Sequence, residues 1–170
     1  PPSPETPSFV AGPVAVVPPS GPAPGVELWP GGTASPAWQA FLEATASGHR
    51  GVCLSREFPD RLRAYLGHRD VEVYWLSNVG RESSVRPGDL PAISALFQRF
   101  LTERGATAIY LEGIEYLLRV HGLQKSLEFL RELDGVARTR DARVWIPVNP
   151  ALVDPSSHQE LMASLRVHST

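Results

Sequence analysis

Residues 51–66 read GVCLSREFPDRLRAYL, and they contain in a row the two patterns from which the fold can be inferred. The first five residues, GVCLS, form a short apolar run between a glycine and a polar turn, which predicts a buried strand. From Pro59 onward, Leu62, Tyr65 and Leu66 lie three or four residues apart, which predicts a short helix. A buried strand followed directly by a helix is typical of an α/β sheet.

The same alternation continues along the chain. Three further short apolar runs predict strands, and these are VEVYWL (71–76), AIYL (108–111) and RVWIPV (143–148). Helical spacing of apolar residues flanks or separates these runs in four places, beginning near Ser35, Asp89, Leu123 and Ser156.

Strands and helices that alternate at this spacing imply right-handed crossovers and parallel strands. We therefore expect a three-layer α/β fold, in which a mainly parallel sheet of four to five strands carries helices on both faces. With the four strands numbered along the chain, the expected order is 2-3-1-4. The residues that follow the helix ending near Leu165 are expected to add the possible fifth strand at an edge.

The first 36 residues differ from the rest in composition. They hold 11 of the 17 prolines and two charged residues, Glu5 and Glu27. Such a segment buries too little apolar surface to fold alone, so we expect a largely irregular, proline-rich linker or tail at 1–36 and a single α/β domain at 37–170. A docking peptide for a partner protein is the alternative, although no basic residue accompanies the prolines. Phe9-Val10 and Val14 to Val17 are candidates to cover an open sheet edge.

Charge and cysteine content narrow the function classes. All 16 Lys and Arg lie beyond residue 36 with all other acidic residues, so residues 37–170 carry no formal net charge. We therefore expect neither nucleic acid nor a membrane surface as a partner. The single cysteine, Cys53, cannot form an internal disulfide, which favours a cytoplasmic location. Because the chain starts at Pro1 without methionine, we expect it to be part of a longer protein.

Polar residues follow each predicted strand. In a parallel sheet the carboxyl ends of the strands meet at one edge, where ligands usually bind. We predict a ligand-binding or partner-binding site there, formed by Ser55, Arg56, Glu57, Ser77, Asn78, Glu112, Glu115 and Asn149.

Three members of this set have alternative interpretations. Arg56 can bind an anion, or it can pair with Glu57, Asp60 or Glu112 in a structural network. Glu112 and Glu115 can form a carboxylate pair for Mg²⁺ or acid/base work, or they can charge the first turn of the next helix. The rings of Tyr74, Trp75, Tyr110 and Trp145 lie in predicted strands, where they pack in the core or seal a pocket.

Several stretches resemble a known family. They are GVCLSREFPDRLR, VYWLSNVG, AIYLEGIEYLLRVHG, SLEFLREL and VWIPVNPALVD. Over residues 50–165 they are similar to domain of unknown function 835, a family often attached to sensory or signalling modules. The resemblance implies a fold like the core of RecA and KaiC-type ATPases. It also implies that Leu111 to Tyr116 corresponds to the Walker B strand, with Glu112-Gly113 where relatives have Asp-Gly.

The sequence argues against catalysis. A phosphate loop, GxxxxGK[ST], needs glycines for close backbone approach and a lysine near the transferred group. After the strand at 51–55 the chain offers Ser55 to Arg61, which contains no glycine, and its single lysine, Lys125, lies in a predicted helix. The five histidines have no paired metal spacing, so we expect no metal and no cofactor.

We therefore predict a non-catalytic signalling or scaffold domain that mediates protein–protein interaction or self-association. Its partner would be another protein or an upstream signalling domain, and a homodimer is possible. The alternative is a nucleotide or cyclic-nucleotide sensor that binds at the carboxyl-terminal edge of the sheet.

Overall fold

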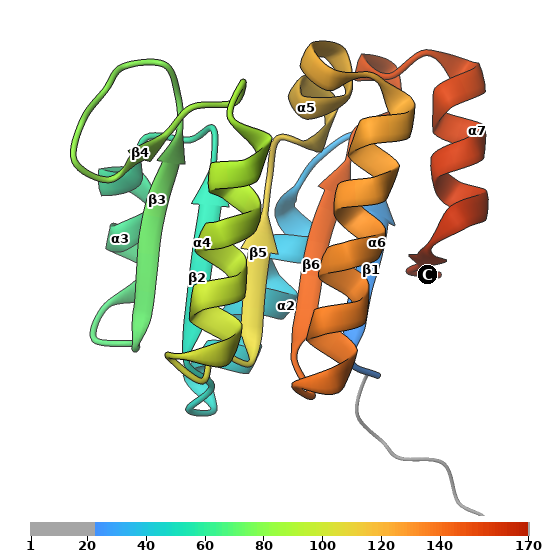
Figure 1. The fold of residues 1–170 in the computed structure, drawn as a ribbon. Coiled ribbons are helices and arrows are strands. Elements are labelled where there is room, and N and C mark those ends of the chain that lie inside the picture. Colours follow the sequence, from blue (N-terminus) through green and yellow to red (C-terminus); the bar gives the residue numbers. More distant parts are fainter. Residues whose placement is uncertain (1–22, 170) are drawn as a thin grey trace, which may run out of the picture.

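The computed structural model describes residues 23–169, which form one seven-stranded sheet between two layers of helices (Figure 1). The strands are β1 (Gly25–Pro30), β2 (Gly51–Ser55), β3 (Val71–Leu76), β4 (Ser84–Val85), β5 (Ala108–Leu111), β6 (Arg143–Val148) and β7 (Arg166–Val167). The helices are α2 (Ser35–Ala46), α3 (Pro59–Leu66), α4 (Leu90–Thr102), α5 (Ile114–His121), α6 (Leu123–Thr139) and α7 (Pro155–Ser164), with a short 3₁₀ turn at Pro150–Leu152.

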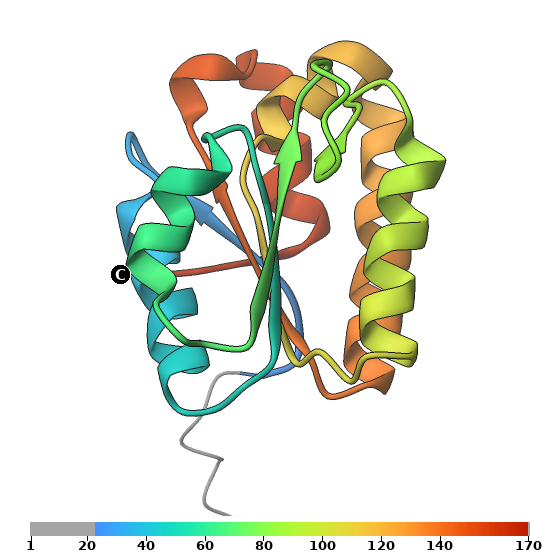
Figure 2. The same cartoon turned by 90° about the vertical axis from the view of Figure 1, so that its left-hand side faces the viewer.

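The expected layers and the parallel sheet are confirmed. The strand order is β4-β3-β2-β5-β6-β1-β7, and all six neighbouring pairs are parallel. Helices α4 and α6 cover one face, and α2 and α3 cover the other (Figure 2). Each face has its own core. One core contains Phe97 of α4 and Leu130 of α6, and the other contains Phe41 of α2 and Tyr110 of β5.

The strand count of four to five was wrong, because the sheet has seven strands. The expected fifth strand exists as β7, and two strands were missed. Strand β1 lies in the segment that we assigned to the linker, where prolines on both sides hide the pattern GVELWP. Its Val26 and Leu28 are fully buried and pair with Val144 and Ile146 of β6. Strand β4 is only two residues long and lies inside an apparent loop.

The expected strand order 2-3-1-4 was also wrong. The four predicted strands are in fact adjacent in the order 2-1-3-4, since β2 lies between β3 and β5. Helix α4 therefore carries the chain across β2 on its way from the β3–β4 edge to β5. Local periodicity predicts each strand but contains no information about its neighbours.

The predicted domain boundary at residue 36 falls inside the folded unit, because β1 belongs to the sheet. Residues 1–22, with Phe9-Val10 and Val14 to Val17, lie outside the described residues. None of the helices in residues 23–169 is long and apolar enough to cross a membrane.

Candidate functional site

The carboxyl ends of β2 and β5 bring four predicted site residues together. The Ser55 hydroxyl donates to Oε1 of Glu112 over 2.7 Å, and the backbone N–H of Arg56 donates to the same oxygen over 3.1 Å. The Ser55 oxygen in turn accepts the backbone N–H of Glu57 at 3.0 Å. One carboxylate oxygen of Glu112 thus fixes the turn between β2 and α3.

Arg56 takes part in this network through its backbone and not through its charge. Its guanidinium carbon lies 4.3 Å from the centre of the Tyr116 ring, a cation–π contact, and in residues 23–169 the guanidinium makes no ion pair. Of the pairings considered for Arg56, the structure shows the one with Glu112, through the Arg56 backbone, and no ion pair of its side chain with Glu57, Asp60 or Glu112. Gly113 makes room for this side chain, because a Cβ there would lie 2.9 Å from Arg56 Cγ.

Glu115 and Asn149 form a second contact at the same edge. The backbone N–H of Asn149 donates to Oε2 of Glu115 over 2.7 Å, and the Asn149 side chain accepts the N–H of Ala151 at 3.0 Å. Burial raises the pKa of the Glu115 carboxyl, while the Asn149 bond and the nearby Arg56 charge oppose this change. Glu115 lies in the first turn of α5, which is the second of the two roles considered for it.

Ser77 and Asn78 lie apart from these contacts, in the turn after β3. The Ser77 oxygen accepts the backbone N–H of Val79 at 3.1 Å, so it stabilises the turn locally. Neither residue lines the two cavities described next.

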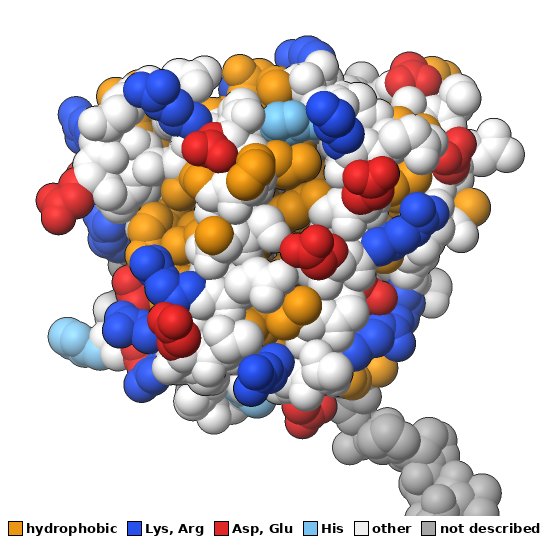
Figure 3. Space-filling model, in the orientation of Figure 1, with side chains coloured by type: hydrophobic (Ala, Val, Ile, Leu, Met, Phe, Trp, Pro, Cys, Tyr) orange, Lys and Arg blue, Asp and Glu red, His pale blue; other side chains and the backbone are white. Residues whose placement is uncertain are grey.

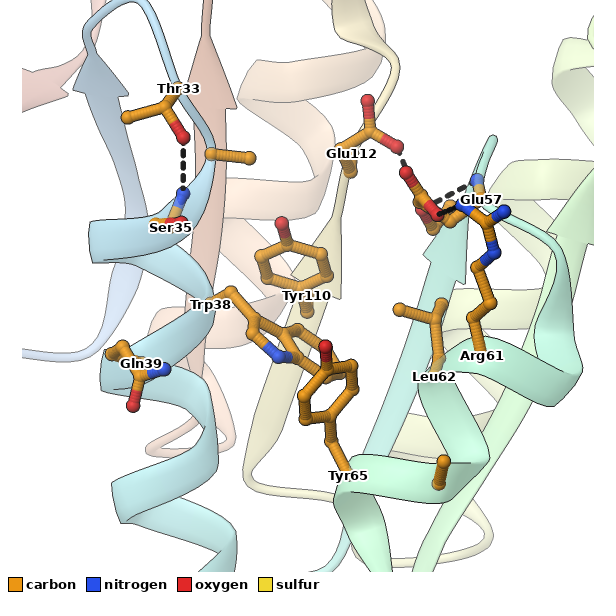
Figure 4. A pocket seen from close by; sticks show the side chains of 13 residues that line it. Thr33, Ser35, Trp38, Gln39, Glu57, Arg61, Leu62, Tyr65, Tyr110 and Glu112 are labelled. Atoms are coloured by element: carbon orange, nitrogen blue, oxygen red, sulfur yellow. Dashed lines mark hydrogen bonds and ion pairs between the residues drawn. The ribbon is translucent and has the colours of Figure 1, made fainter.

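A cavity of about 800 Å³ opens between α2 and α3, above the ends of β2 and β5 (Figure 4). Thr33 and Ser35 form one wall, and Glu57, Arg61 and Leu62 form the other. Its remaining boundary is aromatic, because the Trp38 ring lies edge-on to Tyr110 with ring centres 5.0 Å apart and to Tyr65 at 6.3 Å. Clefts of this size that combine apolar walls with a few polar groups are typical ligand sites.

Tyr110 presents an unpartnered hydroxyl to this cavity. Its side chain is only 3% exposed, and its oxygen points into the open space (Figure 4). No hydrogen bond joins that hydroxyl to another residue in the described part of the chain. Burial, reinforced by the charge of Glu112, strongly raises the pKa of the Tyr110 phenol, so the group stays protonated. Because the hydroxyl reaches the open cavity, a bound ligand could form a hydrogen bond with it.

A smaller cavity of about 150 Å³ lies on the other side of Glu112. It is lined by the turn Gly31 to Ala34 between β1 and α2, by Arg56 and Arg119, and by Asn149. The helices that follow β1 and β5 leave toward opposite faces of the sheet, which is where α/β sheets place ligands.

In this fold, the turn between β1 and α2 resembles a phosphate loop more closely than the turn after β2 does. It places two consecutive glycines, Gly31 and Gly32, between a strand and a helix, whereas the turn after β2 that we considered contains none. This turn is nevertheless too short for GxxxxGK[ST] and has no lysine. Pro36 in the first turn of α2 also removes one N–H donor.

The comparison with protein families gives one match. The family described as “Protein of unknown function (DUF835)” matches residues 34–165. The chain belongs to the DUF835 family. The match begins after β1, so the DUF835 stretch is completed in this structure by a strand that precedes it.

Among solved structures, this DUF835 chain is similar to the KaiC-like protein PH0186 from the hyperthermophilic archaeon Pyrococcus horikoshii OT3. The TM-score is 0.53 at 16% identity, over 74% of this chain and 62% of the other. This likeness concerns the fold alone, and the chain spans less than two thirds of that structure. No curated protein matches the chain.

The sequence analysis missed several residues that line the two cavities of this DUF835 chain. The turn Gly31 to Ala34 fell in the segment that we assigned to the linker, although two glycines before Thr33 and a helix were a usable signal. Trp38 was not among the predicted site residues, although it lines the cavity. Tyr110 was considered for the core or for a pocket, and the structure gives it both positions, with a buried ring and a hydroxyl at the cavity.

Proposed function

We propose that this chain is a non-catalytic signalling domain that acts by binding a small ligand in the cavity between α2 and α3. The observation that carries the proposal is the Tyr110 hydroxyl, which ends a buried ring and is directed into the cavity without a hydrogen-bond partner in residues 23–169. A fixed polar group that a ligand can satisfy gives orientation as well as affinity.

The residues around the cavity support binding without turnover. Oε1 of Glu112, at the position that resembles a Walker B carboxylate, already accepts two hydrogen bonds. The glycine turn before α2 lacks a lysine, and the one lysine of the chain, Lys125, lies in α6. The lysine that a phosphate loop uses to neutralise charge in phosphoryl transfer is therefore missing from this edge.

Indole N–H signals in NMR spectra test the binding proposal, with Trp38→Phe used to assign the Trp38 signal. The panel contains nucleosides, nucleotides, cyclic dinucleotides, aromatic amines and aromatic acids. We expect at least one class to shift the Trp38 signal in wild type and to bind at least tenfold more weakly to Tyr110→Phe. A panel without any effect contradicts the proposal. Phosphate release from ATP or GTP that disappears in Glu112→Gln contradicts its non-catalytic part.

A second candidate function is protein–protein interaction or self-association, and the edge of the sheet at β3 favours it. Strand β4 pairs only with Trp75 and Leu76, and within residues 23–169 no strand pairs with the outer side of Val71 to Tyr74. Figure 3 shows hydrophobic side chains at the surface beside this edge. An open strand edge accepts an added strand from a partner protein or an upstream signalling domain.

Val73→Pro tests the second candidate. The Asp70 carbonyl accepts from β2 at 2.9 Å and the Trp75 N–H donates toward β4 at 2.8 Å, so alternation directs the Val73 N–H outward. Proline there removes an outward donor without breaking the pairing with β2. We expect loss of partner capture or of self-association in sedimentation, with cavity binding retained. Unchanged association would contradict a role for this edge.

A further inference from the structure

The two carboxylate oxygens of Glu112 have different surroundings. Oε1 accepts hydrogen bonds from Ser55 and from the Arg56 backbone, at 2.7 and 3.1 Å. Oε2 has no hydrogen-bond partner in the described part of the chain, although Glu112 lines both cavities. The bonds at Oε1 fix the carboxylate in place, so Oε2 is a positioned acceptor.

The charged residues that line the larger cavity carry more negative than positive charge. Its charged lining residues are Glu57, Arg61 and Glu112. Arg61 lies 3.8 Å from Glu57, an exposed pair, so Glu112 is the one charged residue without an ion-pair partner in the described lining of this cavity, while Arg56 and Arg119 line the smaller cavity on its other side. A ligand group that donates hydrogen bonds or carries positive charge is stabilised here, whereas a phosphate or carboxylate is repelled.

The opposite side of the cavity is aromatic. Trp38 is half-buried and lines the cavity, and the buried Tyr110 ring lies next to it. Aromatic side chains of this kind bind planar rings, and they also attract cations. The Tyr110 hydroxyl adds a second polar group that can accept a hydrogen bond from the ligand.

We infer that the cavity selects a planar ring that carries an amino or ammonium group and rejects rings that carry phosphate or carboxylate. The inference rests on the proposed binding function and specifies its ligand class. Two sources share this chemistry, namely an aromatic amine and the amino-bearing base of an unphosphorylated nucleoside. The Glu112 Oε2 acceptor would receive the ring's donor, while the ring would lie against Trp38 and the Tyr110 hydroxyl would bond to its edge.

Two pairs of probes isolate the polar preference. Tryptamine and indole-3-acetate share a ring and carry opposite charges, and guanosine and GTP share a base and differ in phosphate. We expect tryptamine or guanosine to bind at least tenfold more tightly than its anionic counterpart in calorimetry. Whichever member binds identifies the source. Equal binding within both pairs, or tighter binding of the anions, overturns the inference.

Glu112→Gln is the decisive variant. The glutamine carbonyl can still accept from Ser55 and Arg56, while Oε2 is replaced by an amide donor. We expect an unchanged unfolding midpoint, at least tenfold weaker amine binding, and a reduced or reversed preference between the paired probes. Glu128→Gln is the matched control, because it removes an exposed carboxylate from α6, outside the cavity. An unchanged preference in Glu112→Gln overturns the inference.

The outcomes also separate this inference from the proposed function. If all four probes fail while another member of the wider panel shifts the Trp38 signal and depends on Tyr110, the ligand class is wrong and the binding function stands. If no compound of either set binds, both the ligand class and the proposed binding function are wrong.

Discussion

The two faces of the sheet differ in how their helices are held. On one face α4 and α6 are joined directly, because Glu132 of α6 accepts hydrogen bonds from Ser94 at 3.0 Å and Gln98 at 3.1 Å of α4. Beneath them Phe97 and Leu130 are fully buried. At the surface of this face, charges of both signs are interspersed (Figure 3). This face is closed, and its residues serve packing.

On the other face, α2 and α3 stand apart and leave the cavity between them. Rings of Trp38, Tyr65 and Tyr110 occupy the space near it, and Tyr65 is 63% exposed. The two faces therefore differ in helix packing: α4 and α6 are in direct contact, whereas α2 and α3 leave a cavity between them. Substitutions on the two faces should therefore have different effects on the free energy of unfolding.

The largest expected effect is on the closed face. Phe97→Ala removes a fully buried ring and leaves a cavity, so we expect the free energy of unfolding to fall by about 3–5 kcal/mol in urea denaturation. Tyr65→Ala, on the open face, removes a mostly exposed ring and should cost less than about 1 kcal/mol. Similar losses in the two variants would contradict the division between the faces.

The next effect concerns Gly113, at the end of β5 where the two faces meet. Its φ is +121°, and a Cβ would lie 2.9 Å from both Arg56 Cγ and Leu76 Cδ2. We expect Gly113→Ala to destabilise the fold by about 1–3 kcal/mol, since it combines an unfavourable φ with overpacking.

Gly48→Ala separates these two causes. Gly48 also has a positive φ, +99°, but a Cβ there would meet nothing within 4 Å. It should therefore show the backbone penalty alone and lose less stability than Gly113→Ala. If Gly113→Ala and Gly48→Ala lost the same free energy of unfolding in thermal or urea experiments, the added Cβ at Gly113 would cause no destabilising overlap with Arg56 and Leu76.

The sequence predicted the closed face better than the open one, for a physical reason. The stripe of α4 repeats every three to four residues, and Asp89 caps it by accepting the Ala92 N–H at 3.0 Å, so one short window contains the whole pattern. Strand β1 has an equally clear alternation of Val26 and Leu28, but the surrounding prolines outweighed it.

The cavity could not be predicted in the same way. Trp38 and Tyr110 are far apart in the sequence, and they meet only because β5 lies beneath α2. Their contact depends on the strand order, which no local window contains. The edge residues Ser55 and Glu112 were predictable because strand ends in a parallel sheet always share an edge, whatever the order of the strands.

The smallest expected effect is the pH dependence of Glu115, beside the smaller cavity. Burial raises the pKa of this carboxyl above its ordinary value of 4.5, so the folded state holds the proton more tightly than the unfolded state. The stabilising contribution of that proton is complete below pH 4.5 and is lost as the pH rises through the raised pKa. The Asn149 N–H and Arg56 limit the effect because they favour the charged form.

Glu115→Gln checks the sign. Glutamine can still accept the Asn149 N–H, but it does not titrate. We therefore expect the free energy of unfolding of the variant, relative to wild type, to increase between pH 4.5 and pH 7. Glu128→Gln should show no such trend, because Glu128 is exposed. A difference between Glu115→Gln and wild type that stays constant with pH would mean that the folded and unfolded states bind this proton equally. The Asn149 hydrogen bond and the Arg56 charge would then fully offset the effect of burial on this carboxyl.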